Sequence, residues 1–309
     1  MSTFLVTGAA GFIGSCLAQK LIKEDNEVVT IDNLSTGFKD AIPTGVVFYE
    51  GNCYDNSIIE KLESYNFDAI FHVAGQSSGE ISFEDPVYDL KSNTQSTLQL
   101  LKLALKIKCK KFIYASTMSV YGAQPDRPIS EIDSVKPVSM YAVGKLASEH
   151  YLRIFQQYGL QTTSLRLFNV YGEGQNLLNL KQGMVSIYLA QALKSKHILV
   201  KGSSERYRDL VYIDDIVDSF ICAYNRNGSN DKIYNVSTGE RTTVASLIEK
   251  IISILNEDIS IEYSGSTPGD QFGIYGDFSK IKSELGWYPK VNLDEGLNRM
   301  VEWAKSKNF

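Results

Sequence analysis

The chain has 309 residues, enough for one large α/β unit or two domains. With 43% hydrophobic and 22% charged residues, its composition is that of a soluble globular protein. The net charge of −5 provides no overall positive field for nucleic acid or an acidic membrane, so local groups must hold any anionic ligand.

The cysteine and histidine content argues against a metal centre. The four cysteines are far apart and form no CxxC pair, and there are only three histidines. We therefore expect neither a zinc site nor a disulfide framework, and a reducing cytoplasm fits best. The apolar start lacks a basic segment, and no apolar run approaches roughly 18 residues. We expect no signal peptide and no membrane span.

Strand-like and helix-like segments alternate over the first 120 residues. The predicted strands are 4–11, 27–33, 68–75 and 111–117, and the predicted helices are 15–25, 57–65 and 97–109. Continuous runs of β-branched and aromatic residues between amphipathic helices indicate a parallel sheet covered on both faces. The fold class is therefore α/β.

The pattern loosens after a helix that contains Tyr141. A strand and loop are predicted over 162–172, another strand over 232–237, and helices over 183–195, 213–225, 243–255 and 293–307. No linker marks a boundary near 173. We expect a second, smaller lobe interleaved with the first.

A glycine-rich turn joins the first predicted strand to the first helix. "VTGAAGFIG" places Gly8, Gly11 and Gly14 at a GxxGxxG spacing, with Phe12 and Ile13 opening the helix. Such a turn lets the backbone approach a pyrophosphate, and the helix N-terminus then offers free N–H groups. The spacing alone could also be a chance glycine turn.

An acidic residue ends the second strand. Asp32 lies 18 residues past Gly14 and could accept hydrogen bonds from a ribose diol. It would repel a 2′-phosphate, and the following "NLSTG" has no arginine to offset that, so NAD is favoured over NADP. The same loop contributes further expected cofactor contacts: Asn33, Ser35, Thr36 and Gly37.

The third strand ends in small residues. Val73, Ala74 and Gly75 of "HVAG" would let a flat nucleotide lie close to the strand end. His72 is interpreted as a packed structural histidine rather than a catalyst. Asn93 is either a polar helix cap or a tie between the active-site helix and the sheet, and is a candidate at the cofactor site.

Tyr141 and Lys145 form a YxxxK pair, one helical turn apart. Bringing a tyrosine from about pH 10 to pH 7 requires about 4 kcal/mol. An ammonium about 4 Å away supplies on the order of 4 kcal/mol at an effective dielectric near 20, so Tyr141 could act as a base. Ser116 and Thr117, at the end of strand 111–117, would hold the reacting hydroxyl. The alternative is that Tyr141 and Lys145 are surface residues of a helix without a catalytic role.

Taken together, these segments resemble the extended short-chain dehydrogenase/reductase superfamily, in particular its NAD-dependent nucleotide-sugar epimerases and dehydratases. The motifs are closest to members like UDP-glucose 4-epimerase, and they include "TGAAGFIG", "STMSVYG", "YAVGK", "RLFNVYG", "RDLVYIDD" and "ELGWYP". The resemblance implies a Rossmann-type, doubly wound NAD-binding domain over 1–172 that also receives about 211–239. A substrate-binding lobe would take 173–210 and 240–309.

The resemblance also implies roles for individual residues. Tyr141 would be the base, Lys145 would lower its pKa and bind the nicotinamide ribose, and Thr117 would bond the sugar hydroxyl. Asn52 and Cys53 would lie at the adenine, and Asn169 and Arg208 at the sugar diphosphate. Further substrate contacts would come from two loops and the "PGD" motif: Gln76, Ser77, Ser78, Met184, Val185 and Asp270.

Family chemistry begins with oxidation at carbon 4 of a nucleotide-activated sugar. The 4,6-dehydratases of the family carry an acidic pair after the threonine, where this chain has Met118 and Ser119. A 4-epimerase is therefore favoured. The alternatives are a 4-dehydrogenase acting on a hexose or heptose, then a 4,6-dehydratase, and lastly a non-catalytic NAD-binding regulator.

The identity of the substrate stays open. Thr267 replaces the arginine that usually precedes "PGD" in epimerases, and UDP, GDP, CDP and dTDP sugars are all compatible with the chain. The amphipathic helices around 92–108 and 141–158 are expected to pair with a second subunit as a four-helix bundle.

Overall fold

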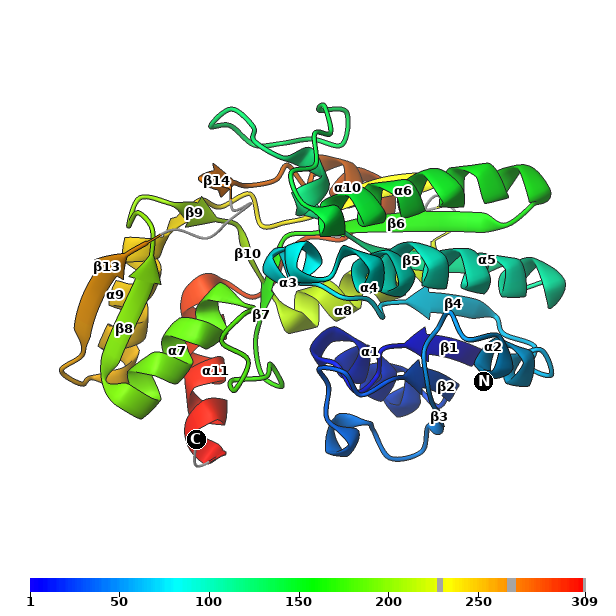
Figure 1. Cartoon of the computed structure of the whole chain (residues 1–309), viewed down its shortest axis with the longest axis horizontal. Coiled ribbons are helices and arrows are strands. Elements are labelled where there is room, and N and C mark those ends of the chain that lie inside the picture. Colours follow the sequence, from blue (N-terminus) through cyan, green and yellow to red (C-terminus); the bar gives the residue numbers. More distant parts are fainter. Residues whose placement is uncertain (227–229, 266–270, 308–309) are drawn as a thin grey trace.

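A large parallel sheet organises the molecule (Figure 1). The computed structural model describes residues 1–226, 230–265 and 271–307. Within them, seven strands pair in the order β11-β6-β5-β4-β1-β2-β3, every pair parallel. They are β1 Thr3–Thr7, β2 Glu27–Asp32, β3 Val47–Glu50, β4 Ala69–His72, β5 Lys111–Thr117, β6 Gln161–Leu167 and β11 Lys232–Val236. This is the predicted doubly wound, Rossmann-type α/β fold.

Helices cover both faces of the sheet because neighbouring strand residues point to opposite sides. In β1, Phe4 and Val6 pack with α1 (Phe12–Lys23) and α8 (Ile213–Asn225), whereas Leu5 faces the other way. That opposite face is covered by α2 Asn56–Leu62, α5 Ser96–Lys106 and α6 Met140–Phe155. Short helices α3 Gly79–Glu84 and α4 Pro86–Leu90 and a π-helical turn, Lys91–Gln95, precede α5.

A smaller lobe contains most of the remaining elements and lies to the left in Figure 1. Its strands are β7 Asn169–Tyr171, β8 His197–Lys201, β9 Tyr207–Arg208, β10 Leu210–Tyr212, β12 Thr242–Thr243, β13 Ser260–Ser264 and β14 Gly273–Ile274. Its helices are α7 Met184–Ser195, α9 Val244–Leu255 and α11 Leu293–Ser306, while α10 Ser279–Leu285 packs near β11. The chain leaves the large sheet after β6 and returns to it at β11, which supports the predicted interleaving of the two lobes.

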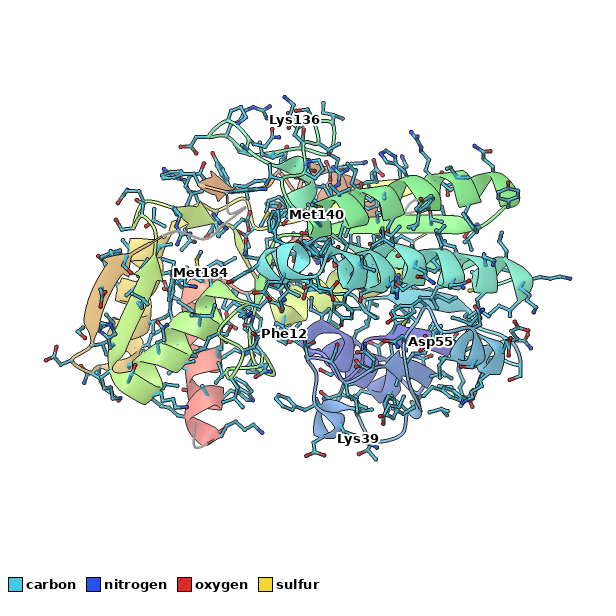
Figure 2. All side chains as sticks on the ribbon, in the orientation of Figure 1. Phe12, Lys39, Asp55, Lys136, Met140 and Met184 are labelled. Atoms are coloured by element: carbon cyan, nitrogen blue, oxygen red, sulfur yellow. The ribbon has the colours of Figure 1, made fainter. Side chains whose placement is uncertain are left out.

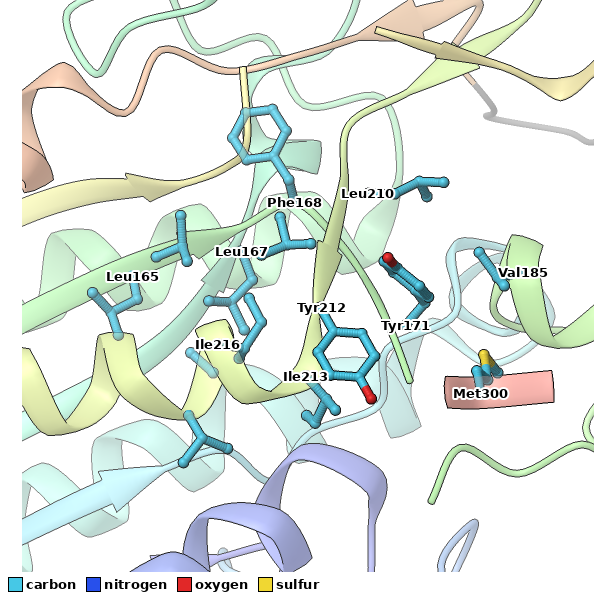
Figure 3. Packing of buried hydrophobic residues seen from close by; sticks show 14 of the residues in the cluster. Leu165, Leu167, Phe168, Tyr171, Val185, Leu210, Tyr212, Ile213, Ile216 and Met300 are labelled. Atoms are coloured by element: carbon cyan, nitrogen blue, oxygen red, sulfur yellow. The ribbon is translucent and has the colours of Figure 1, made fainter. Parts of the chain in front are cut away.

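One hydrophobic core continues from the sheet into the smaller lobe. Figure 3 shows Leu165 and Leu167 of β6 beside Ile213 and Ile216 of α8, with the cluster extending to Tyr171, Val185 and Met300. The shared core fixes the two lobes against each other. Across the described residues, no helix combines the length and apolar character needed to cross a membrane.

The observed boundaries differ from the predicted ones where a turn competes with the apolar pattern. The first strand, expected over 4–11, ends at Thr7 because the Gly8 amide bonds Ile31 and the chain then turns. The helix expected at 15–25 begins three residues earlier, at Phe12. The half-exposed strand β3 and the short helices α3 and α4 were not predicted, since they carry too little apolar periodicity.

Candidate active site

The turn after β1 is shaped to receive an anionic ligand. Gly8 has φ +80°, and a Cβ there would lie 2.9 Å from the Ala74 Cα. A Cβ at Gly14 would lie 2.1 Å from the Gly8 carbonyl oxygen, so the first turn of α1 packs directly on the loop. The N-cap of α1 is Gly11, which has no side chain to bond the first N–H groups. This cradle fits a dinucleotide pyrophosphate.

Asp32 ends β2 beside this turn. Its Oδ2 accepts a hydrogen bond from the Ala10 amide at 3.0 Å, and its Oδ1 accepts one from the Leu34 amide at 2.8 Å. The side chain of Asn33 donates to Asn52 Oδ1 at 2.8 Å, which joins the loops after β2 and β3. The carboxylate is therefore held rigidly at the carboxyl edge of the sheet.

A cavity of about 540 Å³ runs along that edge. Because all strands of the large sheet are parallel, their carboxyl ends meet there, where open α/β sheets bind ligands. Most of the predicted site residues line it: Gly8, Gly11, Phe12, Ile13, Gly14, Asp32, Asn33, Ser35, Thr36, Gly37, Asn52, Cys53, Val73, Ala74, Gly75, Gln76, Ser77, Ser78, Ser116, Thr117, Tyr141, Lys145, Asn169 and Arg208. Figure 2 shows Phe12 at the start of α1, on the side toward the smaller lobe.

Four predicted residues do not line the described part of the cavity. Val185 is 1% exposed and packs in the core, as Figure 3 shows, because α7 turns this face inward. Met184, at the start of α7, is partly buried against the same core. Asn93 is buried behind the cavity wall, and Asp270 lies outside the described residues. The direct contact expected for Val185 is therefore wrong, whereas the contact expected for Met184 stays a prediction.

Tyr141, Lys145 and Thr117 meet at one wall of the cavity. Tyr141 lies in the first turn of α6, whose N-cap Ser139 accepts a hydrogen bond from the Ala142 amide at 3.2 Å. Lys145 reaches back to β5 and donates to the Ala115 carbonyl at 2.9 Å. Its Nζ is 5.9 Å from the centre of the Tyr141 ring.

The expected acidification of Tyr141 by Lys145 does not hold for the chain alone. Burial raises the pKa of Tyr141 to about 12, helped by the Asp89 charge and opposed by a hydrogen bond with Thr117. The loss of hydration destabilises the phenolate by more than the hydrogen bond with Thr117 stabilises it. Burial also lowers the pKa of Lys145 to about 8, although Asp89 and Glu149 act in the opposite direction.

Two buried carboxylates accompany Lys145. Asp89 accepts hydrogen bonds from Gln76 Nε2 at 2.8 Å and from Asn93 Nδ2 at 3.0 Å. Glu149 pairs with Arg166 through two bonds of 2.9 and 2.7 Å. Each carboxylate favours the charged form of the lysine.

The side chains of Gln76 and Asn93 make hydrogen bonds within the cavity wall. Gln76 Nε2 also donates to the Ser78 carbonyl at 2.7 Å, and its Oε1 accepts from the Ser78 amide, so its amide is fully engaged. Asn93 Nδ2 donates to the Gln76 carbonyl at 2.9 Å. Of the two readings of Asn93, the tie between helix and sheet matches these bonds. Gln76 also lines the cavity, so its expected contact with the substrate stays a prediction beside this role in shaping the loop.

His72 is a packed histidine, as interpreted from the sequence. Its ring bonds Thr7 Oγ1 at 2.9 Å and Thr97 Oγ1 at 3.1 Å, and it is fully buried. Burial, and secondarily the Lys145 charge, lower its pKa well below the ordinary value. The ring is therefore neutral and unsuited to proton transfer at the cavity.

Asn169 and Arg208 lie on the side of the cavity formed by the smaller lobe. Arg208 donates to the Tyr207 carbonyl at 2.7 Å and to the Gln271 carbonyl at 2.8 Å. The carboxylate of the neighbouring Asp209 accepts hydrogen bonds from Thr238, Gly239 and Gly276. Within the described residues, Asn169 Oδ1 is buried without a partner, as expected of a group that a ligand completes.

Other lining residues were not singled out from the sequence. Three more buried oxygens in the cavity wall lack partners among the described residues: Ser92 Oγ, Gln175 Oε1 and Gln271 Oε1. Lys181 and Gln182 also line the cavity. The available signal was their position just before Met184 and Val185, which the resemblance placed at the substrate.

Comparison with known proteins agrees with this geometry. The model of the NAD dependent epimerase/dehydratase family matches residues 4–237. The UDP-glucose 4-epimerase of Mycolicibacterium smegmatis is 32% identical over 311 residues, covering 98% of this chain and 99% of that protein.

Two solved structures are similar over nearly the whole chain. The UDP-glucose 4-epimerase of Thermotoga maritima with UDP-glucose has a TM-score of 0.96 and 35% identity, covering 99% of this chain and 100% of that one. The UDP-glucose 4-epimerase of Thermus thermophilus in complex with NAD has a TM-score of 0.91 and 32% identity, covering 98% and 99%.

Proposed function

Because this chain belongs to the NAD-dependent epimerase/dehydratase family, and is thus an enzyme whose cofactor is NAD, we propose that it is a nucleotide-sugar 4-epimerase. One observation carries the proposal. Tyr141, Lys145 and Thr117 share a cavity with the glycine turn and Asp32, so a sugar and a dinucleotide can meet in it.

Tyr141 is the proposed base in this reaction. Bound NAD would add a positive charge to that of Lys145 and so lower the pKa of Tyr141, which burial raises in the chain alone. The Tyr141 phenolate oxygen then takes the proton of the sugar 4-hydroxyl, while the Thr117 hydroxyl orients that group. Bound NAD would accept the hydride that leaves carbon 4 of the sugar and, as NADH, would give it back to the same carbon. After the 4-keto sugar turns in the site, Tyr141 gives the proton back to the carbon-4 oxygen. The sugar leaves with inverted configuration and no net oxidation.

The residues after Thr117 favour epimerisation over dehydration. Removing water across carbons 5 and 6 requires an acid and a base beside the sugar. Met118 and Ser119 line the cavity there, and neither side chain titrates near neutral pH. Ser119 instead donates its amide to Thr117 Oγ1 at 3.2 Å.

A 4-dehydrogenase is the second candidate, because the same residues support the first half of the reaction. It would release the 4-keto sugar and the reduced cofactor. A non-catalytic NAD-binding protein is disfavoured by the presence of Tyr141, Lys145 and Thr117 in one wall. UDP, GDP, CDP and dTDP sugars, with a hexose or a heptose, are the substrates to test.

The test is incubation of the NAD-loaded protein with a panel of nucleotide sugars, followed by NMR. We expect the 4-epimer in at least one reaction, with loss of several orders of magnitude in rate in Tyr141→Phe. NAD should still bind to that variant, as measured by calorimetry. A 4-keto product with stoichiometric NADH would instead identify a dehydrogenase, and near-normal activity of the variant would remove Tyr141 from the mechanism.

We also propose a homodimer formed through α6 and through the continuous helix that runs from α4 across the π-helical turn into α5. α4 and α5 pack against α6. Their outer surface exposes apolar side chains: Val87 is 61% exposed, Leu90 56%, Val143 51% and Ile154 45%. Pairing with the same surface of a second copy would bury them and make a four-helix bundle.

A further inference from the structure

One segment of the smaller lobe crosses the cavity. Residues 174–183, here called the strap, connect β7 to α7. Seven of them line the cavity in its described part: Gly174, Gln175, Asn176, Asn179, Lys181, Gln182 and Gly183. The strap faces the loops that follow β2 and β4. These loops hold proposed cofactor contacts and, at Ser77, a proposed substrate contact.

The first end of the strap is fixed near the glycine turn. The preceding Glu173 accepts hydrogen bonds from Arg299 of α11, at 3.3 Å, and from Tyr212. Gly174 has φ +91°, and a Cβ there would lie 3.8 Å from the Phe12 ring. Asn176 Nδ2 lies 3.5 Å from the Thr36 carbonyl oxygen. This end therefore lies over the start of α1 and the loop after β2.

The second end of the strap is held by two polar contacts to the opposite wall. Lys181 Nζ lies 3.0 and 3.2 Å from the carboxylate oxygens of Glu84, at the end of α3. Gln182 Nε2 donates to Ser77 Oγ at 2.6 Å. Both partners belong to the loop and helix that follow β4, so the contacts bridge the two lobes over the cavity.

These contacts can open. The Lys181 and Glu84 side chains are 51% and 55% exposed, so salt screens their attraction and the pair is weak. Lys181 lines the cavity from the smaller lobe and pairs with a carboxylate of the other lobe, so it is placed to hold the two lobes together.

We propose that Lys181 and Gln182 are positioning residues that keep the strap closed over the bound dinucleotide. The inference rests on the proposed epimerase, in which the reduced cofactor must stay until the hydride returns to the sugar. A closed strap keeps it in place. When the strap opens, the bound dinucleotide can exchange with solution. If NADH leaves before the hydride returns to the sugar, the sugar is released in its oxidised, 4-keto form.

The test measures cofactor dissociation directly. The NADH-loaded protein is mixed with excess NAD, and the fall in NADH fluorescence gives the dissociation rate. We expect Glu84→Gln and Lys181→Met to raise this rate about two- to fivefold, and the charge exchange K181E/E84K to restore it. Higher salt should accelerate dissociation in wild type but not in Glu84→Gln.

A matched control separates the strap from general surface charge. Glu24→Gln removes another lysine-paired carboxylate, 2.9 Å from Lys20 at the far end of α1, and should leave the rate unchanged. Equal rates in wild type, Glu84→Gln and Lys181→Met would overturn the proposal, as would failure of the charge exchange to restore the rate.

The outcome is independent of the sugar chemistry, because NADH dissociation is measured without a sugar. Once a nucleotide sugar that the enzyme converts is known, the second readout is the fraction of turnovers that release 4-keto sugar and NADH. It should rise in Glu84→Gln in step with the dissociation rate. An unchanged fraction despite faster dissociation would contradict a role in catalysis.

Discussion

At the scale of single residues, Lys145 is the group whose charge the proposed chemistry needs. Burial lowers its pKa to about 8, so the ammonium is lost as pH rises through that value. We therefore expect kcat/KM to fall above about pH 8. Asp89 raises the pKa of Lys145, so Asp89→Asn should move this descending limb to lower pH. An amide keeps an oxygen for Gln76 and Asn93, and a pH profile identical to wild type would exclude the role of Asp89.

Asp32 is the residue on which we expect cofactor choice to depend. Its carboxylate lies at the end of β2 in the cavity wall, where it would accept bonds from a ribose and repel a 2′-phosphate. A hydrogen bond to a charged group contributes about 1.5–3 kcal/mol, so Asp32→Ala should weaken NAD binding about 10- to 100-fold. Discrimination against NADP should relax. Calorimetry with both cofactors checks this, and an unchanged preference would contradict the assignment.

At the scale of secondary-structure elements, the first turn of α6 positions Tyr141, the proposed base. Ser139 caps that turn, two residues before Tyr141. Ser139→Ala should cost about 1 kcal/mol of stability and lower Tm by about 2–4 °C. It should also lower kcat, because the turn that holds Tyr141 loosens.

The matched control for this prediction is the N-cap of α11. Asn292 accepts a hydrogen bond from the Glu295 amide at 3.0 Å, away from the cavity. Asn292→Ala should lower Tm by a similar amount with kcat preserved. Equal effects of the two substitutions on kcat would show that the α6 cap has no special part in catalysis.

At the scale of the whole molecule, the exposed face of α4 and α6 predicts self-association. Val143→Glu should shift the protein from dimer to monomer, because a carboxylate would be buried in the apolar contact between the two copies. Light scattering after gel filtration measures the change. Ile132→Glu is the control, since Ile132 is 96% exposed on a separate loop. A wild-type protein that is monomeric at micromolar concentration would refute the dimer.

The sequence by itself determined six of the seven strands of the large sheet, the glycine turn after β1 and the family. Local signals carried this information: buried strands read as continuous apolar runs, and Gly8, Gly14 and Asp32 mark the turn and the end of β2. Strand β5 was predicted at its observed bounds for the same reason. Each of these patterns lies within a short segment of the chain, so it is visible without the folded structure.

Only the tertiary structure decided what surrounds these groups. Burial by residues distant in sequence raises the pKa of Tyr141, which the spacing to Lys145 could not reveal. The amide of Gln76 is taken up by Asp89, and Val185 faces the core instead of the ligand. The bridge from Lys181 to Glu84 joins positions 97 residues apart. Desolvation and contact across lobes are properties of the packed chain, and no local pattern encodes them.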